Sequence, residues 1–318
     1  MIHRIPSGTR DVLPDEMREL RAITDTLRGV FERHGYGEVY TPAIEYESTL
    51  RRGDGGVQPA YRVFDDHGDV LALRADMTVP IARLVATRYP NAEPPLRFCY
   101  IAHAYRQVTP HRGQMREFLQ AGIELVGAPG PPGTAEALTV LCHALDAVGL
   151  EGYRVGLGDA ALYPALLSGL GVDEEHRERL LHELATKDFV GLEREARELG
   201  LDTDLLVGVP QLRGGPDVLD APPGPVADAL GNLRAILDLL DPGVAGRVIF
   251  DLGLARGLGY YSGAVFDVYD PALGEPLGGG GRYDDLLGRF GRDLPAVGFA
   301  LGVDRLHAAL SGEEHAGL

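Results

Sequence analysis

The chain has 318 residues, of which 45% are hydrophobic and 24% charged. This composition is typical of a globular protein with one large domain or two smaller ones, and it excludes a disordered chain. The formal net charge is −17, and Lys187 is the only lysine. Because nucleic acids are bound mainly through lysine and arginine, this charge argues against free-standing RNA or DNA binding.

The compartment is predicted from the cysteines and from apolar segments. Cys99 and Cys142 are the only cysteines, which is too few for a disulfide framework or a zinc site. Residues 1–14 lack the apolar segment of a signal peptide, and no run of ~18 apolar residues is present. We therefore expect a cytoplasmic protein with reduced thiols and no membrane span.

The first half of the chain predicts helices alternating with strands. Apolar residues recur at steps of three and four between Pro14 and His34, and Gly35 suits the turn that ends this helix. The next predicted elements are a short extended run at 38–42, a hairpin with strands at 62–64 and 70–73, a helix at 78–87, and two long strands at 96–105 and 118–126 joined by a polar loop at 107–117.

The second half begins with a Pro/Gly-rich segment at 127–133, which we interpret as a hinge. A helix at 134–148 and a strand at 153–157 follow, and charged helical segments then predict a helical insertion at 166–240. Strands are predicted at 248–252, 258–268 and 297–301, with a last helix at 304–310. We predict an α+β fold in which 1–165 and 241–318 form a core domain with a six- to seven-stranded antiparallel sheet flanked by helices.

The second long strand carries polar residues on one face. Gln120, Gly122 and Glu124 alternate with apolar residues, so their side chains share a face. This pattern is consistent with a polar pocket or with a sheet that has one solvated face. Arg106 ends the preceding strand, where a guanidinium suits a phosphate or carboxylate.

Two other segments carry candidate site residues. Residues 254–261 and 277–284 contain repeated glycines, which allow close backbone approach to a ligand, although a plain loop is the more frequent explanation of a glycine run. Residues 295–305 read as a buried strand that turns into a helix.

These segments together closely resemble histidyl-tRNA synthetase, a class II aminoacyl-tRNA synthetase. The resemblance runs from about residue 5 to residue 310, and the ordered set of motifs is more specific than any one of them. The matching segments are Gly8-Thr9-Arg10-Asp11, Leu73 to Thr78, Tyr105 to Glu124 (class II motif 2), Arg256 to Tyr261 (the histidine signature) and Pro295 to Arg305 (motif 3).

The resemblance implies a histidine pocket and remnants of a nucleotide site. Its histidine-binding residues would be Asp76, Thr78, Gln120, Glu124, Arg256, Tyr260 and Tyr261. Arg106, Arg116 and Arg305 would be vestigial contacts to the phosphates of ATP. Carboxylates suit an ammonium or an imidazole N–H, and arginines suit carboxylate and phosphate.

Three departures from the synthetase pattern are present. Val108 and Thr109 replace the acidic residue and the arginine of motif 2, and Gly259 replaces the aspartate of the signature. The sequence stops after motif 3, so we expect the anticodon-binding domain to be absent. These features, with Asp76-Met77-Thr78 and Arg116 to Gln120, look like the regulatory subunit family of ATP phosphoribosyltransferase, a paralogue of the synthetase.

That resemblance implies a non-catalytic subunit of the first enzyme of histidine biosynthesis. The expected partner is the short-form catalytic subunit in a hetero-octamer, with a homodimer as the building block and L-histidine as the feedback effector. No cofactor, metal, catalytic residue or tRNA partner is expected. The homodimer contact is expected at the first helix and the Thr41-Pro42 segment.

Two other functions stay open. The first alternative is an ATP-dependent histidine-activating enzyme, such as a histidine–tRNA ligase without its anticodon domain. The second is a structural scaffold with a vestigial pocket. The Val108 and Thr109 replacements and the expected absence of the anticodon-binding domain argue against the first, because a valine cannot accept hydrogen bonds from adenine or its water shell.

Overall fold

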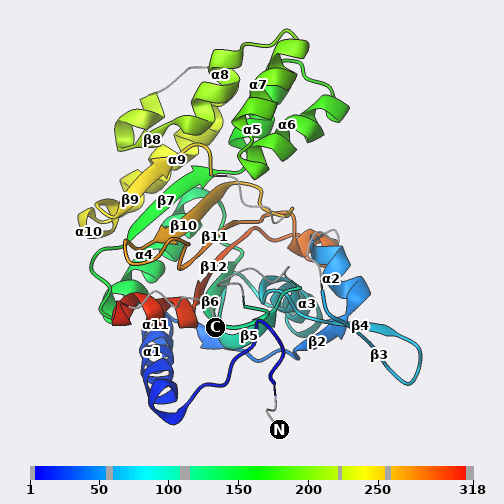
Figure 1. Cartoon of the computed structure of the whole chain (residues 1–318), viewed down its shortest axis with the longest axis vertical. Coiled ribbons are helices and arrows are strands. Elements are labelled where there is room, and N and C mark those ends of the chain that lie inside the picture. The colour runs from blue at the N-terminus through cyan, green and yellow to red at the C-terminus, as the bar shows by residue number, and fades with distance from the viewer. Residues whose placement is uncertain (1–3, 55–59, 108–114, 221–223, 255–258, 313–318) are drawn as a thin grey trace.

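The computed structural model describes residues 4–54, 60–107, 115–220, 224–254 and 259–312 (Figure 1). Within these residues a main sheet has nine strands in the order β1-β5-β6-β12-β11-β10-β7-β9-β8, and a small sheet has the order β2-β4-β3. The strands of the main sheet are β1 Gly37–Glu38, β5 Leu96–Tyr105, β6 Glu117–Val126, β7 Arg154–Asp159, β8 Arg213–Gly214, β9 Val248–Asp251, β10 Ala264–Tyr269, β11 Gly278–Arg282 and β12 Ala296–Gly302. Those of the small sheet are β2 Ile44–Tyr46, β3 Arg62–Phe64 and β4 Val70–Leu73.

Helices flank the main sheet, as the α+β prediction requires. The α-helices are α1 Pro14–Arg33, α2 Glu47–Asp54, α3 Thr78–Arg88, α4 Gly130–Ala147, α5 Leu162–Gly169, α6 Glu174–Thr186, α7 Phe189–Glu198, α8 Thr203–Gly208, α9 Ala227–Leu239, α10 Pro242–Ala245 and α11 Val303–Ser311. Short 3-10 helices are η1 Val209–Gln211, η2 Pro216–Asp220 and η3 Leu287–Phe290.

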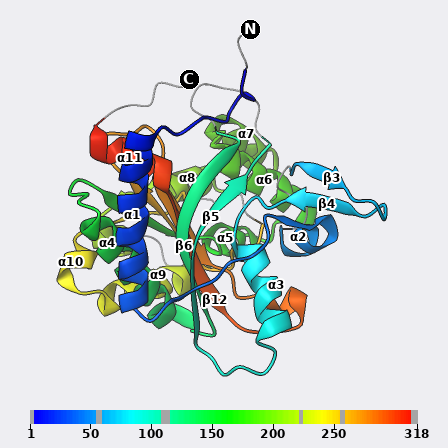
Figure 2. The same cartoon turned by 90° about the horizontal axis from the view of Figure 1, so that it is seen from below.

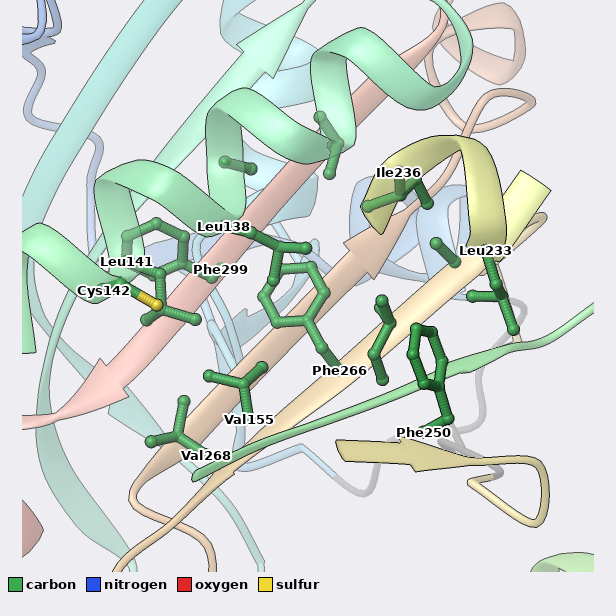
Figure 3. Close-up of a cluster of buried hydrophobic side chains, with 14 of the residues drawn as sticks. Leu138, Leu141, Cys142, Val155, Leu233, Ile236, Phe250, Phe266, Val268 and Phe299 are labelled. Atoms are coloured by element: carbon green, nitrogen blue, oxygen red, sulfur yellow. The ribbon is translucent and has the colours of Figure 1, made fainter. Parts of the chain in front are cut away.

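The two faces of the main sheet have different cover. Helices α1, α4, α9 and α11 pack on one face, whereas α3 packs on the other beside the small sheet (Figure 2). The first face holds the larger apolar core, where Leu138 and Leu141 of α4 lie over Phe266 and Phe299 of the strands (Figure 3). The second face holds a smaller core, which leaves room for polar side chains.

The predicted first helix is confirmed as α1, and its ends follow from local chemistry. Pro14 occupies the first turn, where its missing N–H costs no hydrogen bond, and Asp15 and Glu16 add favourable charges there. Gly35 follows the helix with a φ of +81°, a left-handed conformation that glycine adopts at little cost. The buried stripe of α1 contains Leu20, Ile23, Leu27, Val30 and Phe31.

The two long predicted strands are also confirmed. β5 and β6 pair antiparallel from Leu96 opposite Val126 to Tyr105 opposite Glu117. Six consecutive strands of the sheet, β5-β6-β12-β11-β10-β7, pair antiparallel with one another. The sheet is wider than the predicted six to seven strands because β1 and β9 pair parallel at its two sides and β8 extends it further.

Several sequence expectations were wrong. The glycine run 278–281 is not a loop but the central strand β11, paired on both sides. The expected hinge at 127–133 contains the start of α4, because Pro131 and Pro132 lie in the first turn, which tolerates proline. The predicted strand at 258–268 begins only at Ala264, and of the extended run at 38–42 only Glu38 belongs to a strand, β1.

The region predicted as a helical insertion is mainly helical, with α6, α7 and α8 grouped together at one end of the molecule (Figure 1), but it also contains β8, which pairs with β9 in the main sheet. The last helix of this region, α9, instead packs against α4 and β7 of the sheet. The division into a core at 1–165 and 241–318 and an insertion at 166–240 remains a prediction. None of the helices in the described part of the chain is long and apolar enough to span a membrane.

Candidate functional site

The polar face of β6 meets the first turn of α3 on the side of the sheet away from α1. Glu124 is at the centre of this meeting point, and only 1% of its surface is exposed. One carboxylate oxygen, Oε1, accepts a hydrogen bond from Thr78 Oγ1 at 2.7 Å, and the other accepts from the hydroxyl of Tyr283. The predicted residues Thr78 and Glu124 are therefore brought together, although they are 46 positions apart in the chain.

The backbone beneath Glu124 must be free of a side chain. Gly298 of β12 is the register partner of Glu124, and a Cβ at Gly298 would collide with the Glu124 carboxylate. Gly281 of β11 pairs with Gly298, and a Cβ there would lie 2.8 Å from Cε1 of Tyr261. Glycine at these two positions lets the carboxylate and the tyrosine ring lie flat on the sheet.

The environment of Glu124 favours its neutral form. Burial raises the pKa of Glu124 to about 8, although the hydrogen bonds from Tyr283 and Thr78 act in the opposite direction. The negative charge of Asp76 raises this pKa further. Near neutral pH the carboxyl is therefore largely protonated until a positively charged group arrives beside it.

Tyrosines enclose this carboxyl. The rings of Tyr260 and Tyr283 meet edge to face with centroids 5.7 Å apart, and the ring of Tyr261 lies 5.0 Å from that of Tyr260. Burial raises the pKa values of Tyr100, Tyr260 and Tyr283 well above 10, so each keeps its hydroxyl proton. The wall therefore offers aromatic surface and neutral hydroxyl groups, which suit a flat heterocycle.

Gln120 shares the Glu124 face of β6, as the alternation predicted. Only 9% of its surface is exposed, and its Oε1 is buried without a hydrogen-bond partner among the described residues. A buried acceptor without a donor is costly unless a ligand or water supplies one. Asp76 lies in the same region, with its Oδ1 accepting from the amide of Val79 at 3.1 Å.

The arginines predicted to bind phosphates are engaged within the chain. Arg305 pairs with Glu275 at 2.8 Å and donates to the carbonyl of Pro276, and Arg106 lies over the ring of Phe118 with its Cζ 5.1 Å from the centroid. Arg116 packs against the Gly8 turn, and its Nε is buried without a partner among the described residues. Arg256, Val108 and Thr109 lie outside the described residues.

The site holds both hydrogen-bond acceptors and donors. No three His, Cys, Asp or Glu side chains of the described part of the chain gather as a metal site. A nearly buried carboxyl, an unsatisfied amide oxygen and tyrosine rings suit a small ligand that carries an ammonium or an imidazole N–H.

Comparison with known proteins identifies the family to which the chain belongs. A family model described as histidyl-tRNA synthetase matches residues 8–306. The ATP phosphoribosyltransferase regulatory subunit of Desulforamulus reducens is 39% identical, with 96% of this chain and 79% of the relative aligned. That of Rubrobacter xylanophilus is 42% identical, over 98% and 78%. This chain belongs to the family of ATP phosphoribosyltransferase regulatory subunits.

Solved structures agree with the family assignment and confirm the class II synthetase-like fold. An ATP phosphoribosyltransferase regulatory subunit/histidyl-tRNA synthetase from Bacillus halodurans superposes with a TM-score of 0.88 at 32% identity, covering 98% of this chain and 84% of that chain. A histidine–tRNA ligase subunit from Alicyclobacillus acidocaldarius gives a TM-score of 0.84 at 32% identity, covering 98% of both chains. The regulatory subunit family and the synthetase thus share one architecture.

Sequence reasoning missed two tyrosines of this regulatory-subunit site. Tyr283 follows β11 and reaches Glu124, and Tyr100 of β5 lies over Gly122, where a Cβ would be 2.7 Å from the Tyr100 Cζ. Tyr100 was detectable in principle, because it alternates with Phe98 and Ala102 on one face of a predicted strand. Tyr283 had no such signal, since its contact with Glu124 spans 159 positions.

Proposed function

We propose that this chain is a regulatory subunit that binds L-histidine at Glu124 and passes that binding to the short-form catalytic subunit of ATP phosphoribosyltransferase. The observation that carries the proposal is the buried carboxyl of Glu124, held by Thr78 and Tyr283 among tyrosine rings in a chain of this family. The imidazole or ammonium of histidine would supply the hydrogen-bond donors that this face accepts.

The proposed role is non-catalytic. Arg305 pairs with Glu275 and the carbonyl of Pro276, and Arg106 lies over the ring of Phe118, so each guanidinium already has a partner within the chain. A regulatory subunit does not need these groups, because an effector acts whenever it binds two states of a complex with different affinities. The strongly negative charge of the chain fits a role without tRNA.

The proposed assembly is a hetero-octamer built from homodimers of this chain. The outer face of the small sheet is a candidate surface for a protein contact. Three apolar side chains lie on this face and are largely exposed, Ile44 at 46%, Tyr46 at 53% and Val63 at 44%. Tyr40, next to the Thr41-Pro42 segment, is 83% exposed. Such a cluster of apolar side chains is typical of an interface.

Reconstitution with a short-form catalytic subunit tests the function. We expect phosphoribosyltransferase activity to require this chain and to fall when L-histidine is added. In the complex made with the Glu124→Gln variant, inhibition should need at least about tenfold more histidine. Activity that is indifferent to this chain would refute the proposal, and inhibition unchanged by Glu124→Gln would place the effector elsewhere.

The alternative, an ATP-dependent histidine-activating enzyme, is favoured by one observation, the full-length match to a solved chain named as a histidine–tRNA ligase subunit. It predicts histidine-dependent exchange of pyrophosphate into ATP. We expect no exchange above background with the purified chain. Robust exchange that is lost in the Glu124→Gln variant would favour the enzyme over the regulatory subunit.

A further inference from the structure

The loop that carries Asp76 and Thr78 is held by an arginine to which the resemblance gives no role. Arg74 lies directly after β4, and its surface is only 3% exposed. Its guanidinium donates from Nε to the carbonyl of His103 at 2.8 Å. From the other side it donates to the carbonyls of Thr41 at 2.6 Å and Pro42 at 3.1 Å, and to Thr41 Oγ1 at 3.2 Å.

Backbone hydrogen bonds strengthen the same junction. The amide of Arg74 donates to the carbonyl of Ala43 at 2.9 Å, and the carbonyl of Arg74 accepts from the amide of Tyr105 at 2.9 Å. Thr41 Oγ1 also reaches Met77 Sδ at 3.9 Å. One residue thus joins the 41–43 segment, the end of β5 and the start of the loop that leads to Thr78.

The chemistry of this residue is unusual for a buried cation. Within the described residues Arg74 makes no ion pair, and neutral oxygens accept its hydrogen bonds. A buried charge needs such partners to offset its desolvation. The planar guanidinium can reach carbonyls on two sides at once, whereas a lysine ammonium cannot keep this fork geometry.

We propose that Arg74 is a positioning residue of the ligand pocket, which sets the placement of Asp76 and Thr78 by tying their loop to Thr41, Pro42 and His103. This inference rests on the proposed histidine function for the identity of the ligand, but not for the placement of the loop. Thr78 can donate to Glu124 only when the first turn of α3 lies against β6. A loop released from Arg74 would lose that alignment.

Two variants of the full chain separate positioning from general stability. Arg74→Lys keeps the charge and removes the fork. Arg97→Lys is the matched control, because Arg97 of β5 is a partly buried arginine, makes a bidentate contact with Glu136 at 2.8 and 2.9 Å, and lies on the opposite face of the sheet from the pocket. Both variants are compared by thermal unfolding to show that they are folded.

The first measurement is hydrogen exchange without ligand. We expect amides 74–79 to exchange at least about tenfold faster in Arg74→Lys than in the wild type, while α9 is unchanged and Arg97→Lys shows no effect at 74–79. If amides 74–79 exchange as in the wild type, the proposal is overturned. This result does not depend on whether histidine binds.

The second measurement is a titration with L-histidine in a double-mutant cycle. Arg74→Lys should raise the Kd by about tenfold in the wild-type background but by less than about twofold in the Asp76→Asn background. The Asp76 carboxylate that the loop places beside the ligand is already absent there, so misplacing the loop costs little more. Additive effects, or an equal loss in Arg97→Lys, would reduce Arg74 to a stabilising residue and refute positioning. If the wild type binds no histidine but exchange at 74–79 rises, the histidine function fails while the positioning role stands.

Discussion

Replacement of Glu124 by glutamine removes an ionisable group from the interior and should change how stability depends on pH. The folded protein holds the pKa of Glu124 at about 8 by burial, whereas the ordinary value for glutamate is 4.5. In an unfolded chain the carboxyl ionises near the ordinary value. Between these two values the folded state binds one more proton than the unfolded state.

The sign follows from this difference in proton binding. Because the folded pKa is raised, the contribution of Glu124 to the free energy of unfolding is greatest below pH 4.5 and declines as the pH rises to 8. The span is about 3.5 pH units, at about 1.4 kcal/mol per unit, so the decline is at most about 5 kcal/mol. Glutamine cannot ionise and shows no such decline.

Urea unfolding of wild type and Glu124→Gln at several pH values between 5 and 9 measures the effect. We expect the variant to gain on the wild type with rising pH, by about 2–3 kcal/mol between pH 5 and 7, and the difference to level off above pH 8. Glu136→Gln is the control with the opposite sign, because hydrogen bonds and charge from Arg97 outweigh burial and lower the pKa of Glu136. Between pH 5 and 9 its difference from the wild type should stay constant, because the folded and ordinary pKa values of Glu136 both lie below this range, and it should shrink only as the pH falls below 4.5.

A flat difference between wild type and Glu124→Gln from pH 5 to 9 would refute this reasoning. It would mean that Glu124 is ionised in the folded protein at all these pH values, through a cation or water beside it. The pocket would then not depend on a ligand for its positive charge.

Three further predictions concern the same pocket. Binding of L-histidine near pH 7 should release a proton from Glu124, since a cation beside the carboxyl lowers its pKa; titrations in buffers of different ionisation enthalpy detect this release, and Glu124→Gln should abolish it. Tyr283→Phe removes the hydroxyl that stabilises the Glu124 carboxylate, so the upper end of the pH range over which stability declines should move upward and histidine affinity should fall several-fold. An unchanged upper end in urea unfolding would contradict the contact. Gly298→Ala should destabilise the fold by about 2 kcal/mol or more in thermal unfolding, because the added Cβ collides with Glu124. The control Gly231→Ala in α9, where a Cβ meets nothing within 4 Å, should stabilise the fold by about 0.5–1 kcal/mol, and equal effects of the two substitutions would show that the sheet adjusts at Gly298.

The elements that the sequence determined are those with a local period. The stripe of Leu20, Ile23 and Leu27 at helical spacing predicts α1 because each residue lies on the same face whatever the rest of the chain does. The alternation of Gln120 and Glu124 with apolar neighbours likewise predicts which side of β6 is polar. The motifs around these residues also carried the resemblance that the family comparison confirms.

The tertiary structure decided what depends on distant neighbours. The glycines of β11 form a central strand only because β10 and β12 pair with them, which no local period shows. The raised pKa of Glu124 comes from its burial in the assembled fold, and Tyr283, Tyr100 and Arg74 act on the pocket through contacts between residues far apart in the chain. The periodicity of the sequence predicts only the side of a strand or helix on which a side chain lies. The protonation of Glu124 and the alignment of the pocket residues depend on groups from distant parts of the chain, which only the assembled sheet and its covering helices bring together.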